Sequence, residues 1–330
     1  MPRKPGRAAS DVESLPPEVR FKLLLRATQQ LRRRFAADRG IRSVAFGYKH
    51  TAGELTRTLC VRFYVRRKIV RPGEARAIPK SIRVRVQHEG VRYAFTVPTD
   101  IIEAPGIDRL ETHAKRPKLA PSIFNTTNPN EYGTATALVT DAAGGTSLLT
   151  AAHVAACVLL SPSAALGTAV DSDNAPGVGT LAAYPAVGAS GIDAAIVELS
   201  PGTDGRSLVP RPNGAPVAKV CPESESILLD PGSFTMYSFR RTRSMTFQAA
   251  HPDFTVSDIY AEGPVTFPLI LEFECGAEGG DSGSMVVDGA GRAVGMHIMG
   301  MKGDARYGYS VPIGRVLAGV RPGVTLGLAY

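Results

Sequence analysis

The sequence predicts two domains of different class, a small α+β domain followed by an all-β domain of the barrel or sandwich type. One helical pattern and four alternating segments occupy the first third, and a Pro-rich irregular stretch follows them. After that come many short Val-, Ala- and Leu-rich segments separated by Gly, Asn, Asp and Pro. With 330 residues, 44% of them hydrophobic, the chain can bury a sizeable core without disulfides or metal.

The first third begins with a tail and a helix. Residues 1–15 are polar and aperiodic, which indicates a mobile tail. A helix is expected from Pro16 to about Asp38, and Gly40 suits its C-terminal end. The apolar residues of one helical face are Leu24, Ala27, Leu31 and Phe35.

Strands are expected at about 41–49, 58–68, 81–88 and 91–97, and together with the helix they define a domain over 16–104. Apolar and polar residues alternate along these segments, which predicts a sheet with one buried face and one wet face. The helix is the expected cover of the apolar face. The predicted wet face carries only basic charges, namely Arg62, Arg66, Arg83, Arg85 and Arg92.

Charge is divided unevenly along the chain. Residues 1–120 hold 27 Lys and Arg against 11 Asp and Glu, a net of +16, and residues 121–330 hold 11 against 19, a net of −8. A charge run is most often only a solvated face. A surface of one sign repels itself, however, and a polyanion or an acidic protein would relieve that repulsion. Nucleic acid is one candidate partner, and the acidic second half of the chain is another.

Composition also limits the class of protein. The four cysteines are widely separated and form no C-x-x-C pair, so neither a disulfide framework nor a cysteine zinc site is expected, and no metal or cofactor is predicted. The longest apolar run, 154–160, is far short of the roughly 20 residues that span a bilayer. Acidic residues stand where a signal peptide needs its apolar stretch. We therefore expect a cytoplasmic protein that does not contact a membrane.

Three short segments of the second half carry groups suited to acyl transfer. T-A-A-H ends in His153, D-A-A-I-V-E-L begins with Asp193, and G-D-S-G-S holds Ser282 in a glycine-rich turn. A serine hydroxyl becomes nucleophilic when an imidazole removes its proton, and a buried carboxylate holds that imidazole in one tautomer. A glycine-rich turn can aim backbone N–H groups at the developing oxyanion.

These segments, in this order, resemble the signatures of the chymotrypsin/trypsin-like serine protease family, in a bacterial-type intracellular form. The resemblance covers roughly residues 132–320 and implies an all-β two-barrel protease domain, here assigned to 131–330, preceded by the small α+β domain. It implies a serine endopeptidase with His153 as general base, Asp193 orienting it and Ser282 as nucleophile. The implied oxyanion hole is the N–H groups of Gly280 and Ser282. Ser284, the competing hydroxyl, is expected to be structural.

The sequence departs from the family in two places that matter for activation. The I-V-G-G segment that becomes a new N-terminus is missing, so Asp281, which would pair with that terminus, must be held in another way. The site is then either preformed or assembled by a partner. The hydroxyl residue that commonly supports the triad aspartate, just after His297, is replaced by Ile298.

Specificity is indicated only by a G-x-H-x-x-G pattern around His297. It resembles that of glutamyl endopeptidases and picornaviral proteases, where such a histidine receives Glu or Gln before the scissile bond. Gly276 and Ala277 stand where those proteases have a serine or threonine. A pocket formed by His297, Gly276 and Ala277 that selects an acidic or amide side chain is therefore a hypothesis.

An alternative of a different class stays open. The second domain is then a catalytically silent or latent protease fold, used as a binding module and recruited to a polyanion or a protein through the basic domain. A dedicated protein partner is possible in either case. The linker, 105–130, contains Lys115-Arg116-Pro117-Lys118, which is either a processing site or a tether.

Overall fold

The structure is a computed structural model that describes residues 12, 15–38, 40–66, 78–103, 107–108, 120–174, 176–210, 217, 219–226, 231–257, 259–301, 304–321 and 326–329. Most of the predicted tail, and the basic stretch 115–118 of the predicted linker, lie outside these residues. The chain forms two compact units. The N-terminal unit comprises residues 1–106 and 248–252, and the C-terminal unit comprises 107–247 and 253–330.

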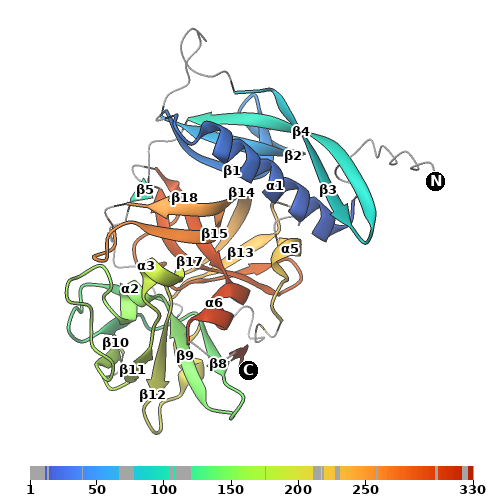
Figure 1. The fold of residues 1–330 in the computed structure, drawn as a ribbon. Helices are drawn as coiled ribbons and strands as arrows, with labels where there is room; N and C mark the ends of the chain where they lie inside the picture. Colours follow the sequence, from blue (N-terminus) through green and yellow to red (C-terminus); the bar gives the residue numbers. More distant parts are fainter. Residues whose placement is uncertain are drawn as a thin grey trace. The chain divides into compact units, whose positions relative to one another are not determined.

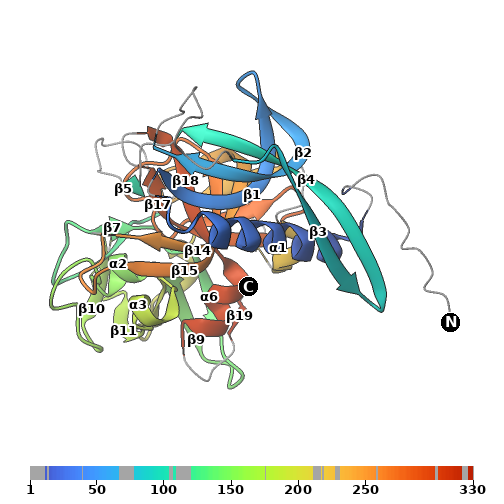
Figure 2. The ribbon, with the colours of Figure 1, turned by 45° about the horizontal axis from the view of Figure 1, so that its top comes forward.

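The N-terminal unit is a helix packed on a four-stranded sheet, so the predicted α+β class is confirmed (Figures 1 and 2). The sheet order is β1-β2-β4-β3, with β2 and β4 parallel and the other pairs antiparallel. Its elements are α1 (Pro17–Phe35), β1 (Ile41–Thr51), β2 (Glu54–Val65), β3 (Ser81–His88) and β4 (Val91–Glu103).

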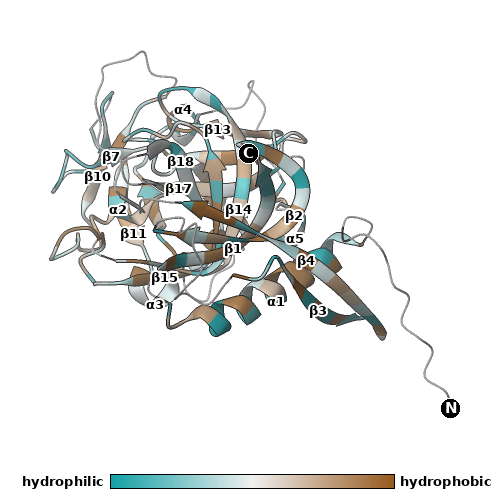
Figure 3. Cartoon of the chain, turned by 90° about the horizontal axis from the view of Figure 1, so that it is seen from above, coloured by the Kyte–Doolittle hydropathy of each residue, from teal (hydrophilic) through white to brown (hydrophobic). Residues whose placement is uncertain are grey.

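Helix α1 forms as the pattern predicts. Proline at its first position has a backbone angle already suited to a helix and lacks an N–H that would have no partner there. The predicted face, which includes Leu24, Ala27, Leu31 and Phe35, is buried. Colouring by hydropathy shows both hydrophobic and hydrophilic patches along α1 and along β3 (Figure 3).

The predicted wet face is wrong for β2, because residues 59–65 are buried on both faces of the strand. Arg62 is only 1% exposed, and its Nη1 donates to the carbonyl of Gln248 at 2.8 Å. Its guanidinium lies over the Tyr64 ring, 5.3 Å from the centroid. The segment 248–252 belongs to the same unit, and Ala250 pairs with a residue of β1. That distant segment supplies an acceptor for Arg62 which local alternation cannot reveal.

The prediction of exposure holds for the remaining arginines of that face. Val84 and Val86 of β3 are buried, and the residues that alternate with them point to solvent. The exposed residues are Arg66, Arg83, Arg85 and Arg92.

The C-terminal unit is built mainly from strands, as predicted, and these strands pair antiparallel in two groups. The first is an eight-stranded sheet in the order β19-β8-β9-β12-β11-β10-β6-β7. Its strands are β6 (Ile123–Asn125), β7 (Tyr132–Gly133), β8 (Ala137–Thr140), β9 (Thr146–Thr150), β10 (Ala169–Ser172), β11 (Gly179–Ala183), β12 (Ala195–Leu199) and β19 (Gly327–Leu328). Strand β6 falls inside the predicted linker, so the end of that segment is part of the folded unit.

The second group closes on itself, since β13 pairs with both β16 and β14 in the ring β13-β16-β17-β18-β15-β14. Its strands are β13 (Phe234–Tyr237), β14 (Thr242–Val256), β15 (Val265–Glu274), β16 (Met285–Asp288), β17 (Ala293–Met301) and β18 (Asp304–Pro312), with β5 (Ile107–Asp108) paired to β17. Three buried aromatic rings, Phe234, Phe247 and Phe273, contact one another inside it. The two-part all-β prediction is therefore confirmed.

Short helices connect these strands. They are α2 (Ala152–Ala155), α3 (Val187–Ser190), α4 (Gly205–Leu208), α5 (Glu223–Ser226) and α6 (Ile313–Gly319). Within the part of the chain that the structure describes, no helix is both long and apolar enough to cross a membrane.

Candidate active site

His153 and Asp193 are brought together by the pairing of β9 with β12. Thr150 at the end of β9 lies opposite Ala195 at the start of β12, so the histidine just after one strand meets the aspartate just before the other. His153 Nδ1 lies 2.7 Å from Asp193 Oδ2, and the backbone N–H of His153 donates to Asp193 Oδ1 at 3.0 Å. With Nδ1 donating to the carboxylate, Nε2 is the nitrogen left to accept a proton.

The carboxylate of Asp193 is fully buried and carries a third hydrogen bond. Burial by itself raises the pKa of Asp193, but the charge of His153 and hydrogen bonds from His153 and Tyr260 outweigh it, so that pKa lies below its ordinary value. The Tyr260 hydroxyl donates to Oδ2 at 2.7 Å. This hydroxyl comes from an element other than the one that holds Ile298, the position at which the family resemblance expects a hydroxyl. Sequence reasoning missed Tyr260, which lies 67 residues away from Asp193 without any local motif.

Ser282 lies in the turn between β15 and β16, beside the segment that follows His153. Its carbonyl accepts from the backbone N–H of Thr134 at 2.8 Å. A Cβ atom placed on Gly133 would lie 2.6 Å from Ser282 O and 2.6 Å from Val154 Cγ2, so these two residues flank Gly133 closely. The Ser282 hydroxyl donates a long 3.4 Å bond to the carbonyl of Ile298.

Two N–H groups of the same turn bear on the predicted oxyanion hole. The N–H groups of Asp281, Gly283 and Ser284 donate to carbonyls, at distances from 2.8 to 3.1 Å. Those of Gly280 and Ser282, which the sequence predicts as the oxyanion hole, have no acceptor among the described residues. Gly280 needs to be glycine, because its φ is +91° and a Cβ would lie 2.8 Å from the Phe239 ring.

Ser284 is the other hydroxyl of this turn. It is fully buried, and it donates to Thr134 Oγ1 at 3.4 Å. Its side chain is therefore not accessible to a substrate.

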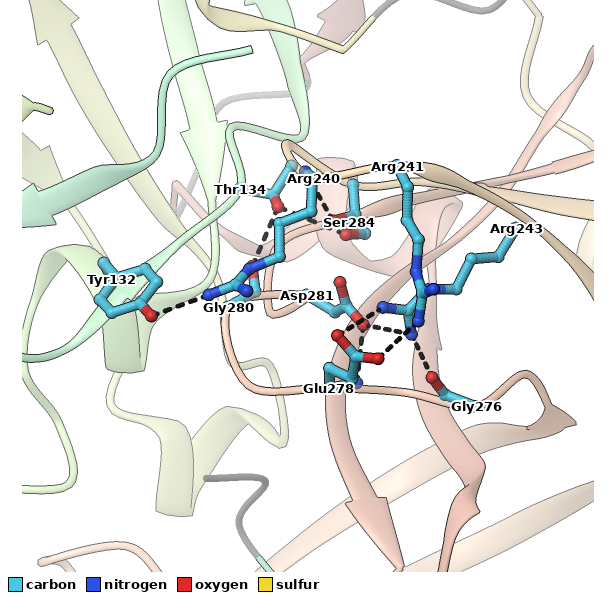
Figure 4. A network of polar contacts seen from close by, with 11 residues as sticks. Tyr132, Thr134, Arg240, Arg241, Arg243, Gly276, Glu278, Gly280, Asp281 and Ser284 are labelled. Atoms are coloured by element: carbon cyan, nitrogen blue, oxygen red, sulfur yellow. Dashed lines mark hydrogen bonds and ion pairs between the residues drawn. The ribbon is translucent and has the colours of Figure 1, made fainter. Parts of the chain in front are cut away.

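Asp281 is held by Arg243, a residue that sequence reasoning did not single out (Figure 4). Arg243 Nη1 lies 2.7 Å from Asp281 Oδ2, and the Arg243 and Asp281 side chains are 6% and 0% exposed. The same oxygen accepts from the backbone N–H of Glu278 at 2.7 Å, and Arg243 also donates to the carbonyl of Gly276. Burial outweighs these interactions, so the pKa of Asp281 is raised and that of Arg243 is lowered.

An internal guanidinium thus stands where the family resemblance calls for a newly formed terminal ammonium. The available signal in the sequence was the run Arg240-Arg241-Thr242-Arg243, a local concentration of positive charge in an acidic half. Arg241 contributes to the same network through an ion pair of 2.5 Å with Glu278, and both side chains are partly exposed.

His297 is buried on β17, 1% exposed. Its Nδ1 has no hydrogen-bond partner among the described residues, and neither has the buried hydroxyl of Ser310, which lies opposite it on β18. Burial, followed by the charges of Arg243 and His153, lowers the pKa of His297 to about 3, so the ring is neutral at pH 7.

The predicted specificity residues are only partly brought together. A Cβ on Gly308 would lie 2.5 Å from His297 Cε1 and 2.8 Å from Cys275 Sγ, so His297 and the residue before Gly276 both lie against Gly308. Ala277 is fully buried, whereas Gly276 is exposed with a φ of +60°. Within the described ranges, no hydrogen bond joins His297 to either residue.

The chain is similar to solved proteases. Nocardiopsis protease (NAPase) matches with a TM-score of 0.40 at 20% identity, over 64% of this chain and 97% of that chain. The active form of Rv3671c protease from M. tuberculosis matches with a TM-score of 0.36 at 20% identity, over 65% and 96%, and an inactive form with a TM-score of 0.38 at 20% identity, over 59% and 84%. No protein-family model and no curated protein sequence matches the chain. The roles of individual residues therefore rest on the geometry of the site.

Two observations bear on other chemistry. Among the described residues, no three His, Cys, Asp or Glu side chains are grouped so that they could hold a metal ion. All four cysteines are buried and free, and burial raises the pKa of Cys60, Cys221 and Cys275 to about 12, which keeps these thiols protonated.

Proposed function

We propose that the C-terminal unit is a serine endopeptidase that works through Ser282, His153 and Asp193. The observation that carries the proposal is the buried His153–Asp193 pair, with two hydrogen bonds of 2.7 and 3.0 Å that fix both the tautomer and the direction of the imidazole. A histidine that needed only to satisfy its own polarity would not require a fully buried carboxylate held by three donors.

The reaction that we propose assigns one role to each of these groups. Ser282 Oγ attacks the scissile carbonyl while His153 Nε2 takes its proton, and the carbonyl π electrons move to the oxygen. The N–H groups of Gly280 and Ser282 stabilise that oxyanion. Its collapse breaks the C–N bond, and His153 returns the proton to the leaving amine. Water, activated by the same imidazole, then hydrolyses the ester to Ser282. Asp193, with its lowered pKa, stays anionic and stabilises the imidazolium.

The pairing of Asp281 with Arg243 supports a site that is preformed in the uncleaved chain. The turn that carries the N–H groups of Gly280 and Ser282 includes Asp281, so the contacts that fix this carboxylate also restrain the direction of those donors. Because the cation is an internal side chain, we propose that no new N-terminus has to be formed for activity.

For specificity we propose the pocket of His297, with a Glu or Gln side chain before the scissile bond. The Nδ1 atom of His297 and the hydroxyl of Ser310 are buried and have no partner among the described residues, and a substrate carboxylate or amide would satisfy them. A peptide library tests this proposal. Preferential cleavage after Arg or after a bulky apolar residue would contradict it.

The first experiment for the activity is labelling of the purified protein with a fluorophosphonate probe, with the site located by mass spectrometry. We expect labelling at Ser282 that disappears in Ser282→Ala. Ser284→Ala is the matched control from the same turn and should keep the label. Absence of label from the wild type, alone and with nucleic acid or candidate protein partners, would favour the silent or latent fold used as a binding module.

For the N-terminal unit we propose nucleic acid as the partner. Its described residues comprise 15 Lys and Arg against 6 Asp and Glu, a net of +9. On α1 the exposed cations Lys22, Arg26 and Arg33 follow helical spacing, and none has an ion-pair partner among the described residues. The apolar face of α1 is buried in its own unit, so the helix has no exposed apolar side to insert into a bilayer.

Binding of the protein to nucleic acid tests this second proposal. It is measured by the fluorescence anisotropy of labelled duplex DNA and single-stranded RNA at about 0.15 M ionic strength. One variant replaces Lys22, Arg26 and Arg33 with Glu. A matched variant replaces Arg83, Arg85 and Arg92 with Glu, so the two variants have the same net charge. We expect binding that weakens steeply with salt and is lost in one of the two variants, which locates the surface. Binding to anionic vesicles alone, or no binding, would refute the proposal.

The free cysteines support a reducing compartment, and we propose the cytoplasm on that ground.

A further inference from the structure

Tyr260 is the one residue of the ring of β13–β18 and its loops whose side chain bonds directly to the Asp193 carboxylate among the residues that the structure describes. It lies in the turn between β14 and β15 and is 5% exposed. Its hydroxyl donates to Asp193 Oδ2 at 2.7 Å, the same oxygen that lies 2.7 Å from His153 Nδ1. One carboxylate oxygen therefore has two close partners, one from each strand group of the C-terminal unit.

The turn that carries Tyr260 makes further hydrogen bonds to the part of the C-terminal unit that carries Asp193. The backbone N–H of Ala261 donates to the carbonyl of Val158 at 3.2 Å, and the Glu262 carboxylate accepts from the backbone N–H of Gly188 at 2.8 Å. The Tyr260 ring also contacts Phe267 of β15, with ring centroids 6.1 Å apart. These contacts restrict both the backbone of the turn and the ring of Tyr260, so they fix the position of its hydroxyl.

The segment leading to Asp193 is fixed against β15 as well. Gly191 has a φ of +62°, and a Cβ there would lie 2.5 Å from the carbonyl oxygen of Thr266. Only glycine tolerates both the backbone angle and this approach. Asp193 follows two residues later, so its carboxylate can move little relative to Tyr260.

We propose that Tyr260 is a positioning residue, whose hydroxyl holds the Asp193 carboxylate in the orientation that directs His153 toward Ser282. This inference rests on the proposed peptidase function. A carboxylate can rotate about its terminal bond, and a second strong donor on Oδ2 fixes that rotation. The donor takes over the task of the hydroxyl absent at Ile298. Tyr260 does not touch the substrate and acts only through Asp193.

The test is Tyr260→Phe, which keeps the buried ring and removes only the hydroxyl. The matched control is Tyr237→Phe on β13, a half-buried tyrosine whose hydroxyl has no hydrogen-bond partner among the described residues. The rate of fluorophosphonate labelling at Ser282 is measured against pH. We expect Tyr260→Phe to react at least tenfold more slowly, with its pH profile moved to higher pH, because a dipole that stabilises the Asp193 charge is gone. Tyr237→Phe should match the wild type in rate and profile.

A second readout does not depend on labelling. The proton between His153 Nδ1 and Asp193 gives a low-field resonance in the proton spectrum, and we expect it to shift in Tyr260→Phe. If that variant does not fold, fluorotyrosine incorporated at position 260 changes only the acidity of the hydroxyl, and the resonance should still move. If the wild type is not labelled but the resonance shifts in Tyr260→Phe, the peptidase function is refuted and the positioning role remains. A labelled wild type, with rate, profile and resonance unchanged in Tyr260→Phe, would overturn the inference alone.

Discussion

Replacing Arg243 with Met should destabilise the C-terminal unit and disable the turn around Ser282. The substitution keeps much of the side-chain length but removes the guanidinium that lies 2.7 Å from Asp281 Oδ2. Because the Asp281 side chain is fully buried, its charge would be left without a counter-ion. Breaking a buried pair in this way costs about 3–5 kcal/mol of unfolding free energy.

The pH dependence of stability shows whether the uncompensated charge of Asp281 is the cause of the loss. The pKa of Asp281 is already raised by burial, and loss of Arg243 raises it further. Between the unfolded and the folded pKa of this carboxyl, the folded state binds more protons than the unfolded state. Stability therefore falls as pH rises, by at most about 1.4 kcal/mol per pH unit. The deficit of Arg243→Met should be smaller at pH 5 than at pH 8.

The assay is urea unfolding at several pH values, with fluorophosphonate labelling of the same samples. Arg315→Met is the control, since its ion pair with Glu223 is partly exposed and should contribute only about 0–1 kcal/mol. The double variant Arg243→Met, Asp281→Asn should recover much of the stability, because no buried charge is left. An Arg243→Met protein with the stability of Arg315→Met, or one that is destabilised yet labelled at the wild-type rate, would refute the reasoning.

Three further predictions follow from single contacts. Because burial lowers the pKa of His297 to about 3, the unfolded state binds a proton that the folded state excludes between pH 6.5 and 3. Stability should fall in acid by up to about 1.4 kcal/mol per pH unit, and His297→Gln should flatten that slope in urea titrations. Gly133→Ala would place a Cβ 2.6 Å from the Ser282 carbonyl, so labelling should be lost even where circular dichroism shows a folded protein. Asp193→Asn cannot hold the same tautomer of His153, and steady-state or labelling rates should fall about 10⁴-fold; a loss below tenfold would contradict its role.

The sequence was sufficient to predict which residues meet when they belong to short motifs at the ends of strands. His153 and Asp193 each adjoin an apolar strand, and pairing of those strands brings the two residues within hydrogen-bond distance. The glycines of the turn at Ser282 likewise indicate its backbone conformation, because Gly280 has a φ of +91°, which favours glycine. The helix over residues 17–35 followed from its apolar spacing and its N-terminal proline.

What the sequence could not provide were partners that lie far away along the chain. Arg62 alternates with apolar residues in a way that predicts exposure, yet it is buried and donates to the carbonyl of Gln248, 186 positions later. Tyr260 and Arg243 are single residues of common types, and their importance comes only from the buried carboxylates that they face. A period-two pattern describes the two faces of one strand and does not reveal a partner that comes from a segment much later in the chain.

The N-terminal unit is discontinuous, and this shapes how the protein can be made. Its last piece, residues 248–252, is translated long after α1 and β1–β4 have left the ribosome. Ala250 pairs with Phe46, and a Cβ on Gly47 would lie 2.1 Å from the Gln248 carbonyl, so this late piece packs tightly against β1. Until it arrives, the cationic side chain of Arg62 has no Gln248 carbonyl to meet. The N-terminal unit is therefore complete only after most of the chain has been synthesised, and an expression boundary drawn after residue 106 would produce an incomplete module.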